Sequence, residues 1–204
     1  IGLAVAEDLA RDGVNICGVD VRAEALSDEM SRIARQHNVG TLAIAANIGN
    51  EAQVIEMVSK GYSKWGRIDI LINNAGVSVV GPLIEISEAD MEFVFDVNVF
   101  GPYRVTKAFA NLIIDSQGRV LNVSSIAGIV SGPFGGVYSM SKHGVEAYTD
   151  SLAAELARFN VAVAAVEPGN YKSSIVASMV DRMRQSGYLA EGSRYRSMLG
   201  LMSG

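Results

Sequence analysis

The sequence predicts an α/β protein with a doubly wound parallel sheet. Three observations support this: segments with helical spacing of apolar residues alternate with short apolar runs, those runs lack polar alternation, and the turns between them are short. Strands without polar alternation are covered on both faces, as in a parallel sheet between two helical layers. Glycine is frequent, at 21 of 204 residues, which suits tight turns between closely packed layers.

The expected elements alternate along the whole chain. Helices are indicated by apolar residues three and four apart, such as Leu26, Met30 and Ile33, and strands by continuous β-branched and apolar runs. In order, the expected elements are a helix over 2–12, a strand over 14–20, a helix over 24–37, a strand over 41–46, a helix over 50–65, a strand over 68–72, a helix over 87–114, a strand over 119–123, a helix over 136–158 and a strand over 161–166.

No linker or charge run divides the chain, so one domain over 1–204 is expected. The last part, 170–204, has weaker periodicity and four of the eight methionines. Methionine makes an adaptable apolar surface, so this part is expected to form a flap over a ligand.

The composition excludes several classes of function. The 17 Lys and Arg residues stand against 22 Asp and Glu residues, which leaves no basic stripe for nucleic acid or for an anionic membrane. No apolar run reaches the roughly 18 residues that cross a bilayer, and no signal peptide opens the chain, so a cytoplasmic location is expected. The single Cys17 and two isolated histidines form no metal-ligand pattern, so no metal is expected.

The polar residues that could do chemistry follow the ends of expected strands. Tyr138 and Lys142 lie four apart on a helix, so their side chains leave the same face. Ser125 follows the strand over 119–123, and a glycine-rich loop joins it to Tyr138 thirteen residues later. Ligands of doubly wound sheets bind outside the carboxyl ends of the strands, and these residues all map to that edge.

Taken together, these residues resemble the classical short-chain dehydrogenase/reductase family, in its compact single-domain, Rossmann-like form. The matching residues are Asn73-Asn74-Ala75-Gly76, Asn98 within Asp96-Val97-Asn98-Val99-Phe100-Gly101, Ser125 within Asn122-Val123-Ser124-Ser125, Tyr138-Ser139-Met140-Ser141-Lys142, and Pro168-Gly169. The family's usual opening, Thr-Gly-x-x-x-Gly-Ile-Gly, is represented only by Ile1-Gly2. The resemblance therefore implies that the first strand and most of the phosphate-binding turn are missing, and that the C-terminal end is shortened too.

The resemblance implies a catalytic tetrad. Tyr138 is expected to be the acid/base at the reacting oxygen, with Lys142 stabilising its phenolate and holding the nicotinamide ribose. Ser125 is expected to donate a hydrogen bond to the substrate oxygen. Asn98, which is a poor helix former, is expected to hold a water that relays protons to Lys142.

The resemblance also implies a dinucleotide cofactor, with NAD favoured over NADP. Asp20 ends the strand over 14–20, where a carboxylate binds the adenosine ribose hydroxyls and repels a 2′-phosphate; its alternative role is to cap the next helix. Relatives that prefer NADP often carry an arginine directly after this point, whereas here Val21 follows and Arg22 comes one position later. The expected cofactor contacts are Ile1, Gly2, Asp20, Asn47, Ile48, Asn74, Ala75, Gly76, Tyr138, Lys142, Pro168, Gly169, Tyr171 and Ser173.

The expected substrate is a small-molecule alcohol or ketone, and a hydrophobic one. The loop over 126–137 contains Ile129, Val130, Pro133 and Phe134 and no charge, and the flap over 170–204 supplies a second apolar wall. The alternatives are that these residues pack on the domain or on a neighbouring subunit, that the protein is a sugar or polyol dehydrogenase, or that it is a non-catalytic dinucleotide sensor or scaffold. Enoyl-thioester reductases are disfavoured because they space the pair as Tyr-x6-Lys and position 145 is a valine.

A homodimer or homotetramer is also expected. Family members pair the helices that correspond to 87–114 and 139–158 across a two-fold axis. These helices carry more apolar positions than one sheet contact needs, namely Phe93, Val97, Phe100, Phe109, Val145, Tyr148, Leu152 and Leu156.

Overall fold

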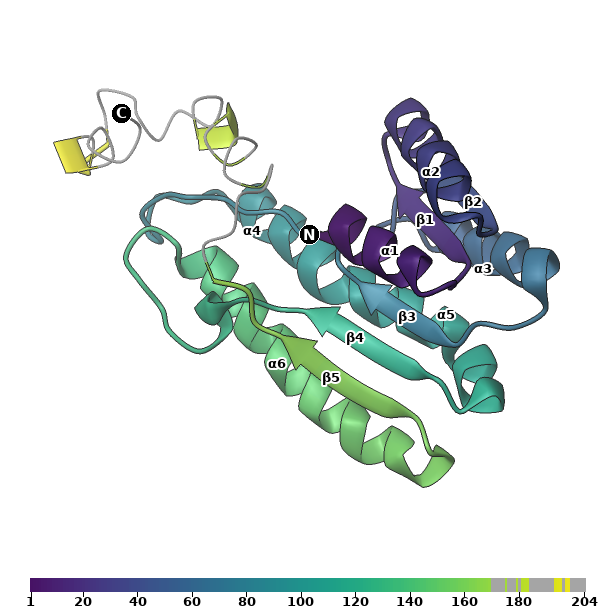
Figure 1. Ribbon diagram of the computed structural model, residues 1–204. Coiled ribbons are helices and arrows are strands. Elements are labelled where there is room, and N and C mark those ends of the chain that lie inside the picture. Colours follow the sequence, from purple (N-terminus) through teal and green to yellow (C-terminus); the bar gives the residue numbers. More distant parts are fainter. Residues whose placement is uncertain (170–174, 176–178, 180, 184–192, 196, 199–204) are drawn as a thin grey trace.

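The computed structural model describes residues 1–169, 175, 179, 181–183, 193–195 and 197–198, and the expected elements occur in the expected order (Figure 1). In chain order they are α1 (Gly2–Arg11), β1 (Ile16–Asp20), α2 (Ala23–His37), β2 (Thr41–Ala45), α3 (Glu51–Trp65), β3 (Ile70–Asn73), α4 (Glu88–Phe95), the π-helical turn η1 (Asp96–Phe100), α5 (Gly101–Ser116), β4 (Arg119–Val123), the 3-10 turn η2 (Ile126–Gly128), α6 (Gly136–Leu156), the 3-10 turn η3 (Ala157–Phe159) and β5 (Ala162–Val166).

All strand pairs are parallel, but the strands form two hydrogen-bonded sheets. β1 pairs with β2, and β4 lies between β3 and β5 (Figure 1). Among the described residues, no strand pairs with both β1 and β3, so the two sheets are not joined through backbone hydrogen bonds. The sequence predicted the parallel pairing but not this division.

A shared hydrophobic core holds the two sheets together. Ile44 of β2 and Leu71 of β3 are buried in one cluster with side chains of α3 and α5, such as Met57 and Phe109. Burying a large apolar side chain fully stabilises the fold by about 1.5–3 kcal/mol, so this cluster fixes the relative position of the sheets.

A second core lies on the opposite face of β1. Ile16 packs there with Ala10 of α1 and Met30 of α2, whereas the next residue, Cys17, packs on the first core. Successive strand residues point to opposite faces, so helices cover both sides of β1. This arrangement confirms the doubly wound α/β fold.

β5 departs from the expectation that every strand is covered on both faces. Ala162, Ala164 and Val166 are exposed, and the residues between them are half-buried. Within the described part of the chain α6 packs on β5, so one face of the strand is covered and the alternate residues face solvent. The prediction of two covered faces is wrong for this strand.

The helix expected over 87–114 is divided by the π-helical turn at Asp96–Phe100. Pro102 follows this turn, and proline has no N–H to donate to the carbonyl four residues earlier, which belongs to Asn98. A π turn absorbs such a break without ending the helix, and turns of this kind are frequent at functional sites. None of the described helices combines the length and hydrophobicity that a membrane-spanning segment needs.

Candidate active site

Ser125 is held at the carboxyl end of the three-stranded sheet. The Ser124 N–H donates to the Val166 carbonyl at 2.8 Å, and the Ile126 N–H donates to the Pro168 carbonyl at 3.2 Å. These two bonds fix the chain on either side of Ser125 next to the segment that follows β5. The side chain of Ser125 forms a hydrogen bond with that of Tyr138 in the first turn of α6.

The acidity of Tyr138 is set mainly by its burial. Burial raises the pKa of the phenol above its ordinary value, and the hydrogen bond with Ser125 lowers it by a smaller amount. The Lys142 ammonium lies 5.6 Å from the centre of the Tyr138 ring. The sequence predicted that Lys142 stabilises the phenolate, but in this structure burial outweighs the influences that favour ionisation.

Lys142 is buried beneath the site, with 3% of its surface exposed. Its Nζ donates to the Val123 carbonyl at 2.8 Å, which ties the side chain to the end of β4. Burial lowers the pKa of Lys142 to about 8, while the charge of Glu146, one helical turn further on, raises it. An ammonium has three N–H donors, so two remain for a ligand after the bond to Val123.

Asn98 has its side-chain amide engaged by the protein. Its Oδ1 accepts from the Val77 N–H at 2.8 Å, and its Nδ2 donates to the Val77 carbonyl and to the Ser141 hydroxyl, both at 2.9 Å. Both amide hydrogens are therefore used. The sequence placed Asn98 correctly at the site, but its side chain ties the loop after β3 to α6, and Pro102 leaves the Asn98 carbonyl without its α-helical donor.

Ser141 is a site residue that sequence reasoning missed. It is fully buried, accepts from Asn98 and donates to the Tyr138 carbonyl at 2.7 Å, so it links two tetrad residues. The available signal was a serine between Tyr138 and Lys142 on the helix, which had been treated only as part of a motif.

A buried polar network behind the site was also missed. Asn73 donates to Thr106 at 3.0 Å and to Asn122 at 2.8 Å, and Asn122 donates to Thr149 at 2.9 Å. The network joins β3 and β4 to α5 and α6, so it fixes the strand ends that carry the site. Asparagine is depleted in strands, and its presence in two apolar strands was the readable signal.

Three of the expected cofactor residues form an open backbone cradle. A Cβ on Gly2 would lie 2.6 Å from Asn74 Nδ2, so this position has room only for glycine, and α1 begins directly against the loop after β3. A Cβ on Gly76 would lie 3.6 Å from both Lys142 Nζ and Asn98 Oδ1. Asn74, Ala75 and Gly76 are exposed. Exposed backbone next to a buried ammonium fits a bound nicotinamide nucleotide.

Asp20 lies at the carboxyl end of β1, as expected, but it has a partner. Its carboxylate forms an ion pair with Arg22, and hydrogen bonds from the Arg22 side chain hold the pKa of Asp20 below its usual range. Its alternative role as a helix cap does not apply, because the residue at the N-cap of α2 is Arg22 and no side chain caps that end.

The remaining expected cofactor residues divide into three groups. Asn47 is exposed, and its Oδ1 accepts from the Gly49 N–H at 2.9 Å, whereas the Ile48 side chain packs inward on Gly101 and the core. Ile1, Pro168 and Gly169 flank the sheet edge described above. The last group, Tyr171 and Ser173, lies outside the described residues, as does most of the expected flap over 170–204.

Phe134 marks one wall of the site. It lies four residues before Tyr138, and its φ of 64° places a bulky residue in the left-handed region, which costs about 1–3 kcal/mol. Its carbonyl accepts from the Gly81 N–H at 2.9 Å, and its ring meets Tyr195 edge-on, with centroids 5.8 Å apart. Strained backbone of this kind is concentrated at functional sites.

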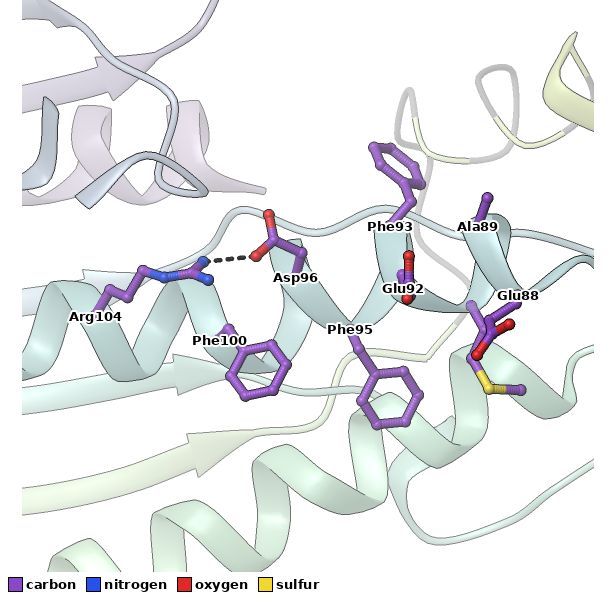
Figure 2. Close-up of a pocket in the computed structure, with 9 residues that line it drawn as sticks. Glu88, Ala89, Glu92, Phe93, Phe95, Asp96, Phe100 and Arg104 are labelled. Atoms are coloured by element: carbon purple, nitrogen blue, oxygen red, sulfur yellow. Dashed lines mark ion pairs between the residues drawn. The ribbon is translucent and has the colours of Figure 1, made fainter. Parts of the chain in front are cut away.

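A groove of about 660 Å³ lies away from the tetrad, along α4, η1 and α5. Figure 2 shows Phe95 and Phe100 projecting to the same side of this helix and the ion pair between Asp96 and Arg104, which measures 2.7 Å. No tetrad residue lines the groove, so it is a surface feature of the helix pair. Within the described part of the chain, no three His, Cys, Asp or Glu side chains gather closely enough to hold a metal ion.

Comparison with known proteins agrees with this geometry. The family described as short chain dehydrogenase matches residues 1–184. A diacetyl reductase, (S)-acetoin forming, of Staphylococcus epidermidis is 35% identical over 177 residues, which make up 86% of this chain and 68% of the relative.

Two solved structures show the same fold. A short chain dehydrogenase/reductase from Burkholderia phymatum in complex with NAD has a TM-score of 0.86 and 27% identity, covering 99% of this chain and 73% of that one. An NAD⁺-bound xylitol dehydrogenase has a TM-score of 0.83 and 30% identity, covering 95% and 74%. The chain therefore belongs to the short-chain dehydrogenase/reductase family of oxidoreductases.

Proposed function

We propose that the protein transfers a hydride between NAD(H) and a secondary alcohol or ketone. The observation that carries this proposal is the meeting of Ser125, Tyr138 and Lys142 at the end of β4, next to the open backbone of Gly76. A phenol bonded to a serine hydroxyl, with a buried ammonium below it, can move a proton to or from a carbonyl oxygen.

Each residue of the site has a distinct task in this proposal. Tyr138 gives its proton to the forming alkoxide in reduction and takes it back in oxidation, while Ser125 donates a hydrogen bond that orients the same oxygen. Lys142 replaces the proton of Tyr138, and the main-chain carbonyl of Asn98 accepts from the relay water because its side chain is already engaged. The bound nicotinamide supplies or accepts the hydride. Gly2, the 74–76 backbone and Lys142 hold the dinucleotide.

NAD is the proposed cofactor because Asp20 places a carboxylate at the end of β1, where it accepts from the adenosine ribose. Two of the similar solved structures, including the xylitol dehydrogenase, were determined with NAD bound. The preference over NADP is expected to be at least ~tenfold, which corresponds to about 1.4 kcal/mol.

The proposed substrate is hydrophobic. Ile129 and Val130, on the loop that leads from Ser125 to Tyr138, are 61% and 64% exposed, and Leu83 packs on Gly136 beside them in sequence. A charged or heavily hydroxylated substrate would lose hydration against these side chains without gaining a partner. The flap over 170–204 is proposed to form the opposite wall.

A substrate panel tests both the reaction and the substrate class. With NAD(H) and reduced-nicotinamide absorbance as readout, medium-chain secondary alcohols and ketones are expected to give a kcat/KM at least ~tenfold above polyols, since each buried methylene contributes to transition-state binding. The panel includes diacetyl and xylitol, because relatives named for these compounds make a small diketone and a polyol the competing substrates. Higher efficiency on xylitol would show that the apolar wall has been misinterpreted. Tight NADH binding without turnover of any compound would favour the sensor or scaffold alternative.

The helix pair is proposed to form a homodimer or homotetramer interface. Phe109 and Val145 do not contribute, since they are 6% and 2% exposed in the core, so that part of the prediction is wrong. Phe100 and Tyr103 are 51% and 46% exposed along the groove of Figure 2, and exposed aromatic residues are typical of interfaces.

Light scattering tests the assembly. The protein is expected to be dimeric or tetrameric at micromolar concentration, and Phe100→Glu is expected to dissociate it because a charge would be buried in the interface. Phe159→Glu is the matched control, since Phe159 is 40% exposed on η3 and outside the groove. A monomeric wild-type protein, or equal dissociation by both variants, would contradict the proposed interface.

A further inference from the structure

The carboxylate of Asp20 is already occupied by Arg22. Oδ1 of Asp20 accepts from the Arg22 main-chain N–H at 2.9 Å and from Nε at 3.0 Å, and Oδ2 accepts from Nη2 at 3.1 Å. The guanidinium thus folds back onto the strand end in a two-pronged ion pair. This is the carboxylate to which the proposed function assigns recognition of the adenosine ribose.

The occupied carboxylate has little capacity left for a ribose. A carboxylate offers about four acceptor sites, two on each oxygen. Three of the four are filled by Arg22, so one site on Oδ2 remains for a ribose diol that has two hydroxyls to donate. Full recognition of the diol therefore requires the Arg22 side chain to move away.

The same pair makes the strand end tolerant of a phosphate. Arg22 cancels the charge of Asp20, so a 2′-phosphate would not meet an uncompensated anion. A guanidinium has five N–H donors, and the two used on Asp20 leave three that no described residue accepts. The Arg22 side chain is 70% exposed, and α2 begins directly after it with no side-chain cap, although Glu24 in its first turn carries an opposing charge.

We propose that Arg22 is a specificity-determining residue that narrows the preference for NAD created by Asp20. This inference rests on the proposed function, which brings a dinucleotide to this edge. With NAD, the ribose competes with Arg22 for Asp20. With NADP, Arg22 keeps its bonds to Asp20 and donates its remaining N–H groups to the 2′-phosphate. The pair is exposed, and exposed ion pairs are weak, so either arrangement is accessible.

Equilibrium binding tests the proposal without relying on turnover. Dissociation constants for NADH and NADPH are measured by the fluorescence of the bound nicotinamide, in the wild-type protein and in Arg22→Ala. The control is Arg11→Ala, which removes the same charge and a comparable exposed ion pair, with Asp8, from the helix that precedes the other end of β1. Both substitutions lie on the surface, and thermal unfolding confirms that each variant is folded.

Arg22→Ala is expected to raise the preference for NADH over NADPH at least tenfold, by weakening NADPH while leaving NADH unchanged or tighter. Arg11→Ala is expected to change it less than twofold. An Arg22→Ala ratio within twofold of wild type, or equal shifts in both variants, would overturn the proposal for Arg22 and leave the dinucleotide function standing. Failure of either dinucleotide to bind the folded wild-type protein would overturn the proposed function and this inference with it.

Discussion

Replacing Tyr138 by phenylalanine is expected to lower kcat by more than ~10⁴-fold while NADH binding stays close to that of the wild type. General acid–base catalysis alone contributes about 10²–10⁴-fold, and the substitution also removes the hydroxyl that contacts the reacting oxygen. The fold is expected to survive, because the Ser125 hydroxyl keeps its hydrogen bond from the Ala127 N–H at 3.1 Å. Stopped-flow measurement of hydride transfer and fluorescence titration of NADH separate the two effects.

Tyr148→Phe is the matched control for this experiment. Tyr148 lies on the same helix, is also half-buried and also forms a side-chain hydrogen bond, in this case with Thr106. It has no contact with Ser125 or Lys142 among the interactions of the described residues, so its loss is expected to change kcat by less than ~threefold. Near-normal turnover in Tyr138→Phe would eliminate the proposed acid/base, and equal losses in both variants would point to a structural effect on α6.

The features that the sequence predicted well are those encoded locally. Helical and strand periodicity located the elements, and the spacing of Tyr138 and Lys142 on one helix, with Ser125 after a strand, located the site. These features depend on backbone geometry that repeats every 3.6 or 2 residues, so they survive without knowledge of the tertiary partners.

The features that were missed depend on partners distant in sequence or on the direction of a side chain. The exposed face of β5 reflects what packs on it, and the amide of Asn98 is committed to Val77 and Ser141 from other elements. The fold-back of Arg22 onto Asp20 is a choice of rotamer that periodicity does not encode. The π turn before Pro102 is different, because its cause was readable in the sequence.

Lys142 is expected to cost the protein stability, so replacing it by methionine is expected to stabilise the fold while abolishing activity. The fall in its pKa from 10.5 to about 8 corresponds to about 3 kcal/mol against the charged form in the folded state. Methionine fills similar space without a charge, but it leaves the Val123 carbonyl without its donor, which costs about 1–2 kcal/mol. The net expectation at pH 7 is a rise of about 1–2 kcal/mol in the free energy of unfolding, together with weaker NADH binding.

The pH dependence identifies burial of the charge as the cause. Since the folded-state pKa lies below the unfolded value, the folded protein binds fewer protons between pH 8 and 10.5, and the cost of Lys142 is fully present below pH 8. As the pH rises through this window the buried amine becomes neutral, so the advantage of Lys142→Met over wild type is expected to shrink and to be lost near pH 10.5. Urea unfolding of both proteins from pH 6 to 10.5 measures the difference, with Lys64→Met, at an exposed position on α3, as the control. A destabilised Lys142→Met variant whose difference from wild type stays constant across this range would show that the lysine is retained for stability rather than for proton transfer.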